Sequence, residues 1–127
     1  MSHVPEADNH IYRGEDWTML ASFYDDDAPT EAEFEDWDAF MEIRTARGTL
    51  LVRCTTTEGD GFITREMNEE TPPEPTFRVR IPKATTRGFP VGTHKADLFV
   101  VPGAGDTFPL FVGEVVVSNR VTIEEGP

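Results

Sequence analysis

The alternation of apolar and polar positions predicts extended strands along most of the chain. It is clearest over residues 37–44, where Trp37, Met41 and Ile43 fall on one face of the segment. Successive side chains of a strand point to opposite faces, so a period of two indicates a half-buried strand. Phe40 is the exception, because it falls among the polar positions of the other face.

Six further segments are rich in β-branched and aromatic residues and are bounded by Gly, Pro or Asp, which is typical of strands. They are residues 17–24, 49–56, 62–67, 77–81, 95–101 and 108–117. In all we expect about eight strands and at most one helical turn, near residues 84–87. Residues 31–36 are few and mostly acidic and are predicted as a loop, and the prolines of 68–75 make that segment a stiff loop.

Short strands at this spacing favour a β-sandwich. A chain of 127 residues is of single-domain size. We expect a flexible N-terminal arm over residues 1–9, one β-sandwich domain over 10–123 and a C-terminal tail over 124–127. The predicted core contains Trp17, Trp37, Met41, Ile43, Val79 and Leu98.

Charge is distributed unevenly along the chain, whose net charge is −13. Residues 1–45 hold 13 acidic and 2 basic side chains, whereas residues 46–127 hold 11 acidic and 9 basic ones. Such a surface disfavours nucleic acids and anionic membranes as partners, because both bind through basic patches. The imbalance either serves solubility alone or lets an acidic side of one copy meet the basic group of another. That basic group is Arg78, Arg80, Lys83, Arg87 and Lys95.

Membrane and secretion signals are not expected in this sequence. No apolar run approaches the roughly 20 residues of a membrane span, and the first residues lack the basic and apolar regions of a signal peptide. Synthesis in a cytoplasm follows as the expectation. Cys54 is the single cysteine, which excludes an intrachain disulfide, and its alternation with Leu50 and Val52 predicts a buried thiol.

The sequence offers no set of residues suited to catalysis. His3, His10 and His94 are scattered, without the ligand spacing of a zinc site. The aspartates 25–27 lack the interleaved pattern and the distal Glu of a calcium loop. No nucleophile or phosphate-binding motif is present. We therefore expect no enzymatic activity, no catalytic residues, no metal and no cofactor.

Aromatic residues at polar positions are the stronger lead. Phe40 and Phe99 fall opposite the apolar face of their strands, and Phe108 and Phe111 cannot both face one core if their strand is regular. A bulge or a second apolar face could absorb them. The alternative is a subunit interface, where aromatic residues and Arg concentrate. The candidate interface residues are Phe40, Arg78, Arg80, Arg87, Phe99 and Phe111.

Four segments, taken in order, resemble a known family. They are residues 11–17, residues 34–44, the stretch from Phe77 through the Pro90-Val91-Gly92 turn to Leu98, and residues 110–117 followed by Val121-Thr122. Together they resemble small immunoglobulin-like proteins encoded among the structural genes of tailed bacteriophages. In architecture they also resemble the N-terminal domain of phage upper-baseplate proteins. His94 and Ala96 stand where that family has tyrosines, and residues 31–36 are more acidic than its usual segment.

This resemblance implies an all-β, immunoglobulin-like antiparallel β-sandwich of about 7–9 strands with little or no helix. It further implies a non-enzymatic structural protein of the virion, made in the bacterial host cytoplasm and present in several copies at the tail, neck or baseplate. Its partners would be other virion proteins and copies of itself. Two alternatives stay open: a capsid decoration or head-fibre protein, and a carbohydrate-binding adhesion module that uses exposed aromatic rings.

Overall fold

The fold is all-β, as the sequence predicts, and its strands join into one mixed sheet. The computed structural model describes residues 3–5, 9–23, 28–57, 61–69, 71, 73–103 and 105–119. In this part of the chain nine strands follow the order β1-β3-β7-β6-β5-β4-β8-β9-β2. They are β1 (His3–Pro5), β2 (His10–Tyr12), β3 (Trp17–Phe23), β4 (Asp38–Arg44), β5 (Leu50–Thr55), β6 (Gly61–Met67), β7 (Pro75–Ile81), β8 (Gly92–Val101) and β9 (Phe108–Ser118).

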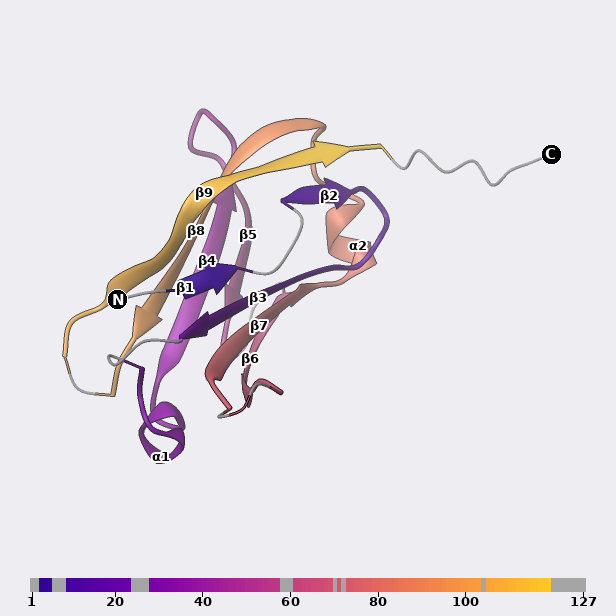
Figure 1. Cartoon of the computed structure of the whole chain (residues 1–127). Helices are drawn as coiled ribbons and strands as arrows, with labels where there is room; N and C mark the ends of the chain where they lie inside the picture. Colours follow the sequence, from indigo (N-terminus) through magenta and orange to yellow (C-terminus); the bar gives the residue numbers. More distant parts are fainter. Residues whose placement is uncertain are drawn as a thin grey trace.

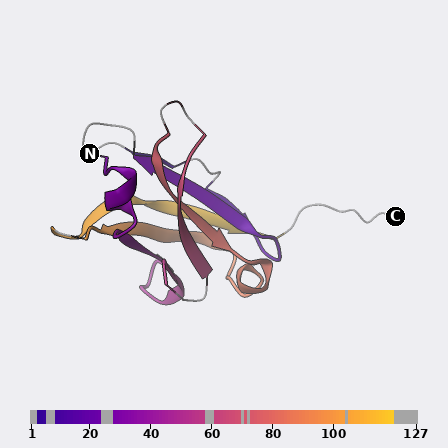
Figure 2. The same ribbon diagram turned by 90° about the horizontal axis from the view of Figure 1, so that it is seen from below.

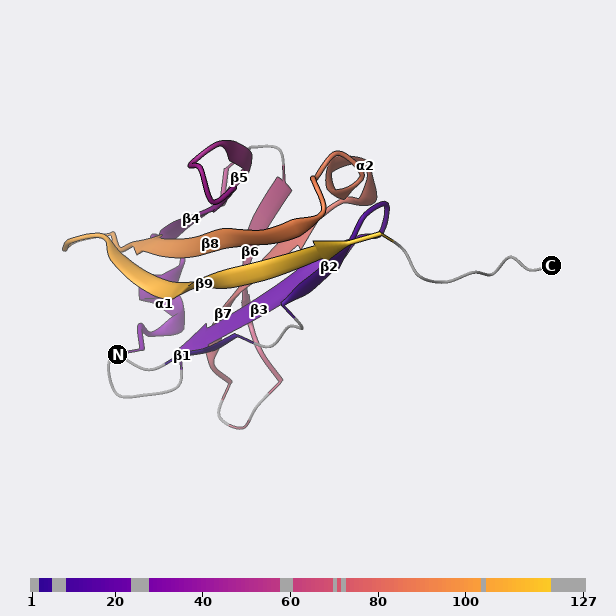
Figure 3. The same ribbon diagram turned by 90° about the horizontal axis from the view of Figure 1, so that it is seen from above.

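The sheet curls until it is nearly barrel-shaped (Figure 1). Seen from above, β8 and β9 lie across from β3 and β7 (Figure 3), and β1 at one edge of the sheet comes close to β9 near the other. The side chains of one sheet face can therefore meet in a common interior. This arrangement allows a single sheet to enclose a core without a covering helix layer.

Two ladders distinguish this sheet from the antiparallel one that the sequence predicts. Among the described strands, six of the eight pairs are antiparallel, but β2 pairs with β9 and β5 pairs with β6 in parallel. The β5–β6 ladder consists of two residue pairs, Cys54 with Gly61 and Thr55 with Phe62. The sheet is therefore continuous there, but only narrowly.

Three residues of the predicted N-terminal arm form a strand. The expected flexible arm contributes β1, which pairs antiparallel with the end of β3 so that Val4 lies opposite Ser22. Neither β1 nor β2, at three residues each, is long enough to show a two-residue period in the sequence. The predicted C-terminal tail lies outside the described residues.

The predicted loop at residues 31–36 contains a short helix, α1 (Glu31–Phe34). Its first turn is closed by a capping box: the Glu33 amide donates to the Thr30 hydroxyl over 3.2 Å, and the Thr30 amide donates to the Glu33 carboxylate over 2.9 Å. This reciprocal pair satisfies two amides that a helix start otherwise leaves exposed. The prediction of a loop was wrong because it weighed acidic content above the Thr-x-x-Glu spacing.

A second short helix, α2 (Lys83–Thr86), forms close to the predicted turn at 84–87. Each helix spans four residues, and no helix in the described part of the chain is long and apolar enough to cross a membrane. The two helices lie at opposite ends of the strands (Figures 1 and 2). α1 follows the end of β3, and α2 follows the end of β7, which runs antiparallel to β3. We call these two regions the α1 end and the α2 end.

A cluster of aromatic rings fills the interior towards the α1 end, and Phe23 is its centre. The Phe23 ring centroid lies 6.3 Å from that of Phe34, 5.6 Å from Trp37, 6.2 Å from Phe77 and 6.5 Å from Phe108. All four contacts are edge-to-face, the geometry that the ring quadrupole favours. The cluster thus joins α1, the start of β4, β7 and β9 through one side chain.

The predicted core residues lie in this interior, with one at its border. Met41, Ile43, Val79 and Leu98 are fully buried, and Trp17 is 7% exposed. Trp37 is partly buried and packs against the core from the residue before β4. Cys54 is fully buried, as predicted.

Truncating the central ring should cost far more stability than truncating the ring at the border. We expect Phe23→Ala to lower the free energy of unfolding by about 3–5 kcal/mol, the usual cost of a buried Phe-to-Ala change. Trp37→Ala should cost about 2 kcal/mol, because part of that ring already contacts water. Urea denaturation at pH 7 measures both, and equal losses would contradict a cluster centred on Phe23.

Candidate functional site

Two predicted interface residues meet on the outer face of β4 and β8. Phe40 and Phe99 are cross-strand neighbours, and their rings stack with centroids 5.4 Å apart and planes 19° from parallel. The Arg53 guanidinium, from β5, lies 4.6 Å from the centre of the Phe40 ring. This is a cation–π contact, which orients both side chains. Both rings are half-buried.

Glu42 organises the charges beside this stack. Arg44 donates from Nε to Glu42 Oε1 over 3.0 Å, and Arg53 donates from Nη1 to the other carboxylate oxygen. Burial is the largest single influence and would raise the pKa of Glu42, but hydrogen bonds and positive charge from the two arginines together lower that pKa. Glu42 therefore stays ionised at neutral pH and holds Arg53 over Phe40.

An exposed aliphatic residue extends this surface onto β9. Val112 is 67% exposed and lies opposite Asp97 of β8. We refer to Phe40, Arg53, Phe99 and Val112 as the aromatic patch. It is a gently curved sheet surface, with apolar groups interleaved among fixed charges. Arg53, Glu42 and Val112 were not among the predicted interface residues, although Arg53 and Glu42 alternate with core residues on their strands.

The predicted basic residues lie elsewhere, and two of them are neutralised by neighbours. Arg78 on β7 binds the Glu66 carboxylate with two hydrogen bonds of 2.7 and 3.1 Å, and these bonds raise the pKa of Arg78. Arg80 donates to Asp16 over 2.9 Å. Arg87 is exposed at the C-terminus of α2. None of the three belongs to the aromatic patch.

Phe111 packs against the core instead of lying at an exposed interface. The register of β8 and β9 shifts between Leu98 and Phe99, which is the bulge that sequence reasoning left open. The Phe111 ring covers Gly113, where an added Cβ would come within 2.8 Å of the ring. Conversely Phe62, which was not predicted as an interface residue, is 55% exposed and lies opposite Arg80.

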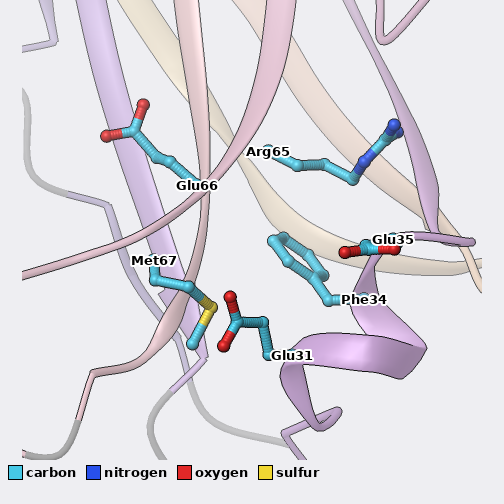
Figure 4. A pocket seen from close by; sticks show the side chains of 6 residues that line it. All are labelled: Glu31, Phe34, Glu35, Arg65, Glu66 and Met67. Carbon is cyan, nitrogen blue, oxygen red and sulfur yellow. The ribbon is translucent and has the colours of Figure 1, made fainter.

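A small pocket lies between α1 and β6 (Figure 4). Its volume is about 240 Å³, and it is lined by Glu31, Phe34, Glu35, Arg65, Glu66 and Met67. The close-up shows the Phe34 ring between α1 and β6, with Glu31 and Met67 on one side and Glu35 on the other. Phe34 and Met67 make the pocket partly apolar.

Of the four charged side chains that line this pocket, two bind described partners and two form no ion pair with a described residue. Arg65 donates to the Trp37 carbonyl over 3.0 Å and to Asp38 over 3.3 Å, and Glu66 is held by Arg78. Glu31 and Glu35 are exposed, and neither forms an ion pair with any described residue. They are four residues apart, a spacing that places two helical side chains on one face. In the sequence, the capping-box spacing of α1 is the feature that could have indicated these two glutamates on one helical face.

The described residues contain no group of three or more His, Cys, Asp or Glu side chains placed to hold a metal ion. His10 stacks on Tyr12 with ring centroids 4.6 Å apart, and His94 is buried near the start of β8. The aspartates 25–27 lie outside the described residues.

The chain matches no known protein-family model, and a search among curated proteins found no similar sequence.

The ionised state of Glu42 should make a pH-dependent contribution to stability. Its pKa is lower in the folded protein than its usual value of 4.5, so the contribution is complete above that value and is lost as the pH falls through the lowered pKa. We expect Glu42→Gln to cost about 1 kcal/mol at pH 7, with the difference from the unmodified protein shrinking below pH 4.5.

Urea titrations at pH 7 and at several acidic pH values test this dependence. Glu114→Gln is the matched control, since Glu114 is exposed on β9 and forms no ion pair with a described residue. If Glu42→Gln lowered the free energy of unfolding by the same amount at every pH, the charge of the carboxylate would not be the source of the stabilisation.

Proposed function

We propose that this protein is a non-enzymatic structural component of a tailed bacteriophage particle, present in several copies at the tail, neck or baseplate. The aromatic patch carries the proposal, because it combines stacked rings and an oriented arginine on an open sheet face. These residue types concentrate at the centres of protein interfaces. The resemblance of the sequence to phage structural proteins is the reason for assigning this interface to a phage particle.

The patch suits a protein partner better than a small molecule. Sites for small molecules are mostly concave, whereas the patch lies on the outer face of four neighbouring strands. Phe40 is held by Phe99 on one side and by Arg53 on the other. Binding therefore costs little side-chain entropy, since the groups that would make contact are already ordered.

We also propose that the curled sheet is an immunoglobulin-like sandwich. The support is its strand order, which divides at the two-pair β5–β6 ladder into β1-β3-β7-β6 and β5-β4-β8-β9-β2. Immunoglobulin domains place their first, second, fifth and fourth strands in one layer and the third, sixth and seventh in the other. Counting β5 as the extra strand of the variable type, β1, β3, β7 and β6 correspond to the first layer, and β4, β8 and β9 to the second.

A buried histidine supports the same assignment. In immunoglobulin domains a tyrosine near the start of the sixth strand hydrogen-bonds to the backbone a few residues upstream. Here His94, near the start of β8 and 6% exposed, donates from Nε2 to the Pro90 carbonyl over 2.7 Å. The resemblance had marked His94 as standing in place of a tyrosine, and this bond gives it the same structural task.

Purified particles provide the test of the virion role. Mass spectrometry of particles from the host that produces this chain should find it in several copies, and a reconstruction should place it at the tail, neck or baseplate. A double variant, Phe40→Ser with Phe99→Ser, should fold but be lost from the particles. Phe62→Ser, which removes an exposed ring outside the patch, is the control.

Other outcomes of that experiment would replace the proposal. Density on the capsid shell would make the chain a decoration or head-fibre protein. Absence from the particles, together with glycan binding that Phe40→Ser abolishes, would favour the adhesion module.

Substitution of His94 tests the immunoglobulin-like corner. We expect His94→Ala to lower the free energy of unfolding by about 2 kcal/mol, because it leaves the Pro90 carbonyl without its partner and opens space beneath the turn. His94→Tyr should lose less than half as much, since a phenol hydroxyl can take over the hydrogen bond. Urea denaturation compares both with the exposed neighbour variant Thr93→Ala, and a tyrosine variant as unstable as the alanine one would contradict the assignment.

A further inference from the structure

We propose that copies of this protein associate head to tail, with the α2 end of one copy docked on the pocket at the α1 end of the next. The inference rests on the proposed assembly role and names the partner of a second surface, distinct from the aromatic patch. It is carried by the distribution of charge between the two ends, the pocket beside α1, and the matching spacing of charges on the two short helices.

The two ends of the strands carry opposite charge. At the α1 end, the carboxylates that form no ion pair with a described residue are Glu31, Glu33, Glu35, Asp36, Glu69, Glu74 and Asp106. At the α2 end, the cations that form no ion pair with a described residue are Arg13, Arg47, Lys83 and Arg87. The strand directions produce this separation, because α1, the end of β6 and the β8–β9 turn lie at one end of the sheet, and α2 and the β4–β5 turn lie at the other.

The helices present complementary pairs of charges. Glu31 and Glu35 lie four residues apart on α1 and its C-terminal cap, and Lys83 and Arg87 lie four residues apart on α2 and its cap. All four side chains are exposed. Like charges at this spacing destabilise a helical turn, so each pair is locally unfavourable in an isolated copy. Contact between the two helices relieves both repulsions at once.

The pocket suits a basic side chain in particular. Lys and Arg bury an aliphatic stem on apolar surface while the charged head stays near water or a counter-charge. Met67 is half-buried and offers most of that apolar surface, since Phe34 lines the pocket but is only 3% exposed. Glu31 and Glu35 stand at its border. The cation already in the pocket, Arg65, is turned to the Trp37 carbonyl and Asp38, so it leaves the two glutamates to a partner.

The placement of the two surfaces determines the symmetry. Because they lie at opposite ends of one domain, an end-to-end contact through a two-fold axis would bring acid against acid. An end-to-end contact that pairs acid with base is head to tail, and such contacts close into rings or extend as filaments. The net charge of −13 opposes association of copies, but salt at about 0.15 M screens charges more than about 8 Å apart and leaves contacting groups to act.

Charge reversal separates a specific contact from this general repulsion. Glu31→Lys with Glu35→Lys changes the net charge from −13 to −9, which would strengthen association if net charge alone mattered. We expect instead that sedimentation at 0.15 M salt shows self-association weakened by at least about tenfold. Asp97→Lys with Glu114→Lys, which gives the same −9 from mid-sheet positions, is the matched control and should not weaken it.

Mixing complementary variants completes the test. Lys83→Glu with Arg87→Glu should also lose self-association, and a mixture of this variant with Glu31→Lys/Glu35→Lys should form complexes that neither forms alone. A monomeric unmodified protein up to about 1 mM, or association that survives both reversals, would overturn the inference. If the protein were nevertheless found in particles, the proposed function would still stand. If it were absent from particles but showed salt-sensitive association in solution, only the proposed function would be rejected.

Discussion

The contact of Phe23 with four other aromatic rings is the constraint on which the described structure most depends. The rings come from α1, the residue before β4, β7 and β9, so this one cluster ties together segments that are far apart in the chain. It holds Phe34 inward, and Phe34 in turn fixes the four-residue helix α1 at the end of the sheet. A helix this short has little stability of its own. The pocket and its two glutamates are therefore placed by a hydrophobic interaction and not by charge.

The order of charges in space differs from their order along the chain. In sequence, acids dominate the first third and bases are grouped near residues 78–95. In the folded protein Arg78 and Arg80 are paired with Glu66 and Asp16, and what remains is a separation between the two ends of the strands. Antiparallel neighbours create this separation, because alternate connections gather at the same end. The polarity of the molecule is thus a consequence of topology.

The sequence predicted the parts of the fold in which one local pattern decides the outcome. The period of two over residues 37–44 correctly placed Met41 and Ile43 inward and left Phe40 on the outer face. Contacts between distant residues could not be read in this way: Arg80 meets Asp16 across 64 positions, and nothing near either residue announces it. The shift of register in β9 likewise turned Phe111 towards the core. Of the candidate surfaces, sequence reasoning found the two rings but neither Arg53, which orients one of them, nor the pocket.

The narrow β5–β6 ladder has a consequence for solubility. Beyond its two pairs, and among the described strands, residues 50–53 of β5 have β4 as their only neighbour, and residues 63–67 of β6 have only β7. Both strands therefore present edge backbone, which in other proteins invites pairing with a foreign strand and aggregation. Each carries an arginine there, Arg53 and Arg65, and charged side chains are a common guard on such edges. Arg53 therefore places a charge on this edge, where a charge hinders pairing with a foreign strand, and it also orients the ring of Phe40.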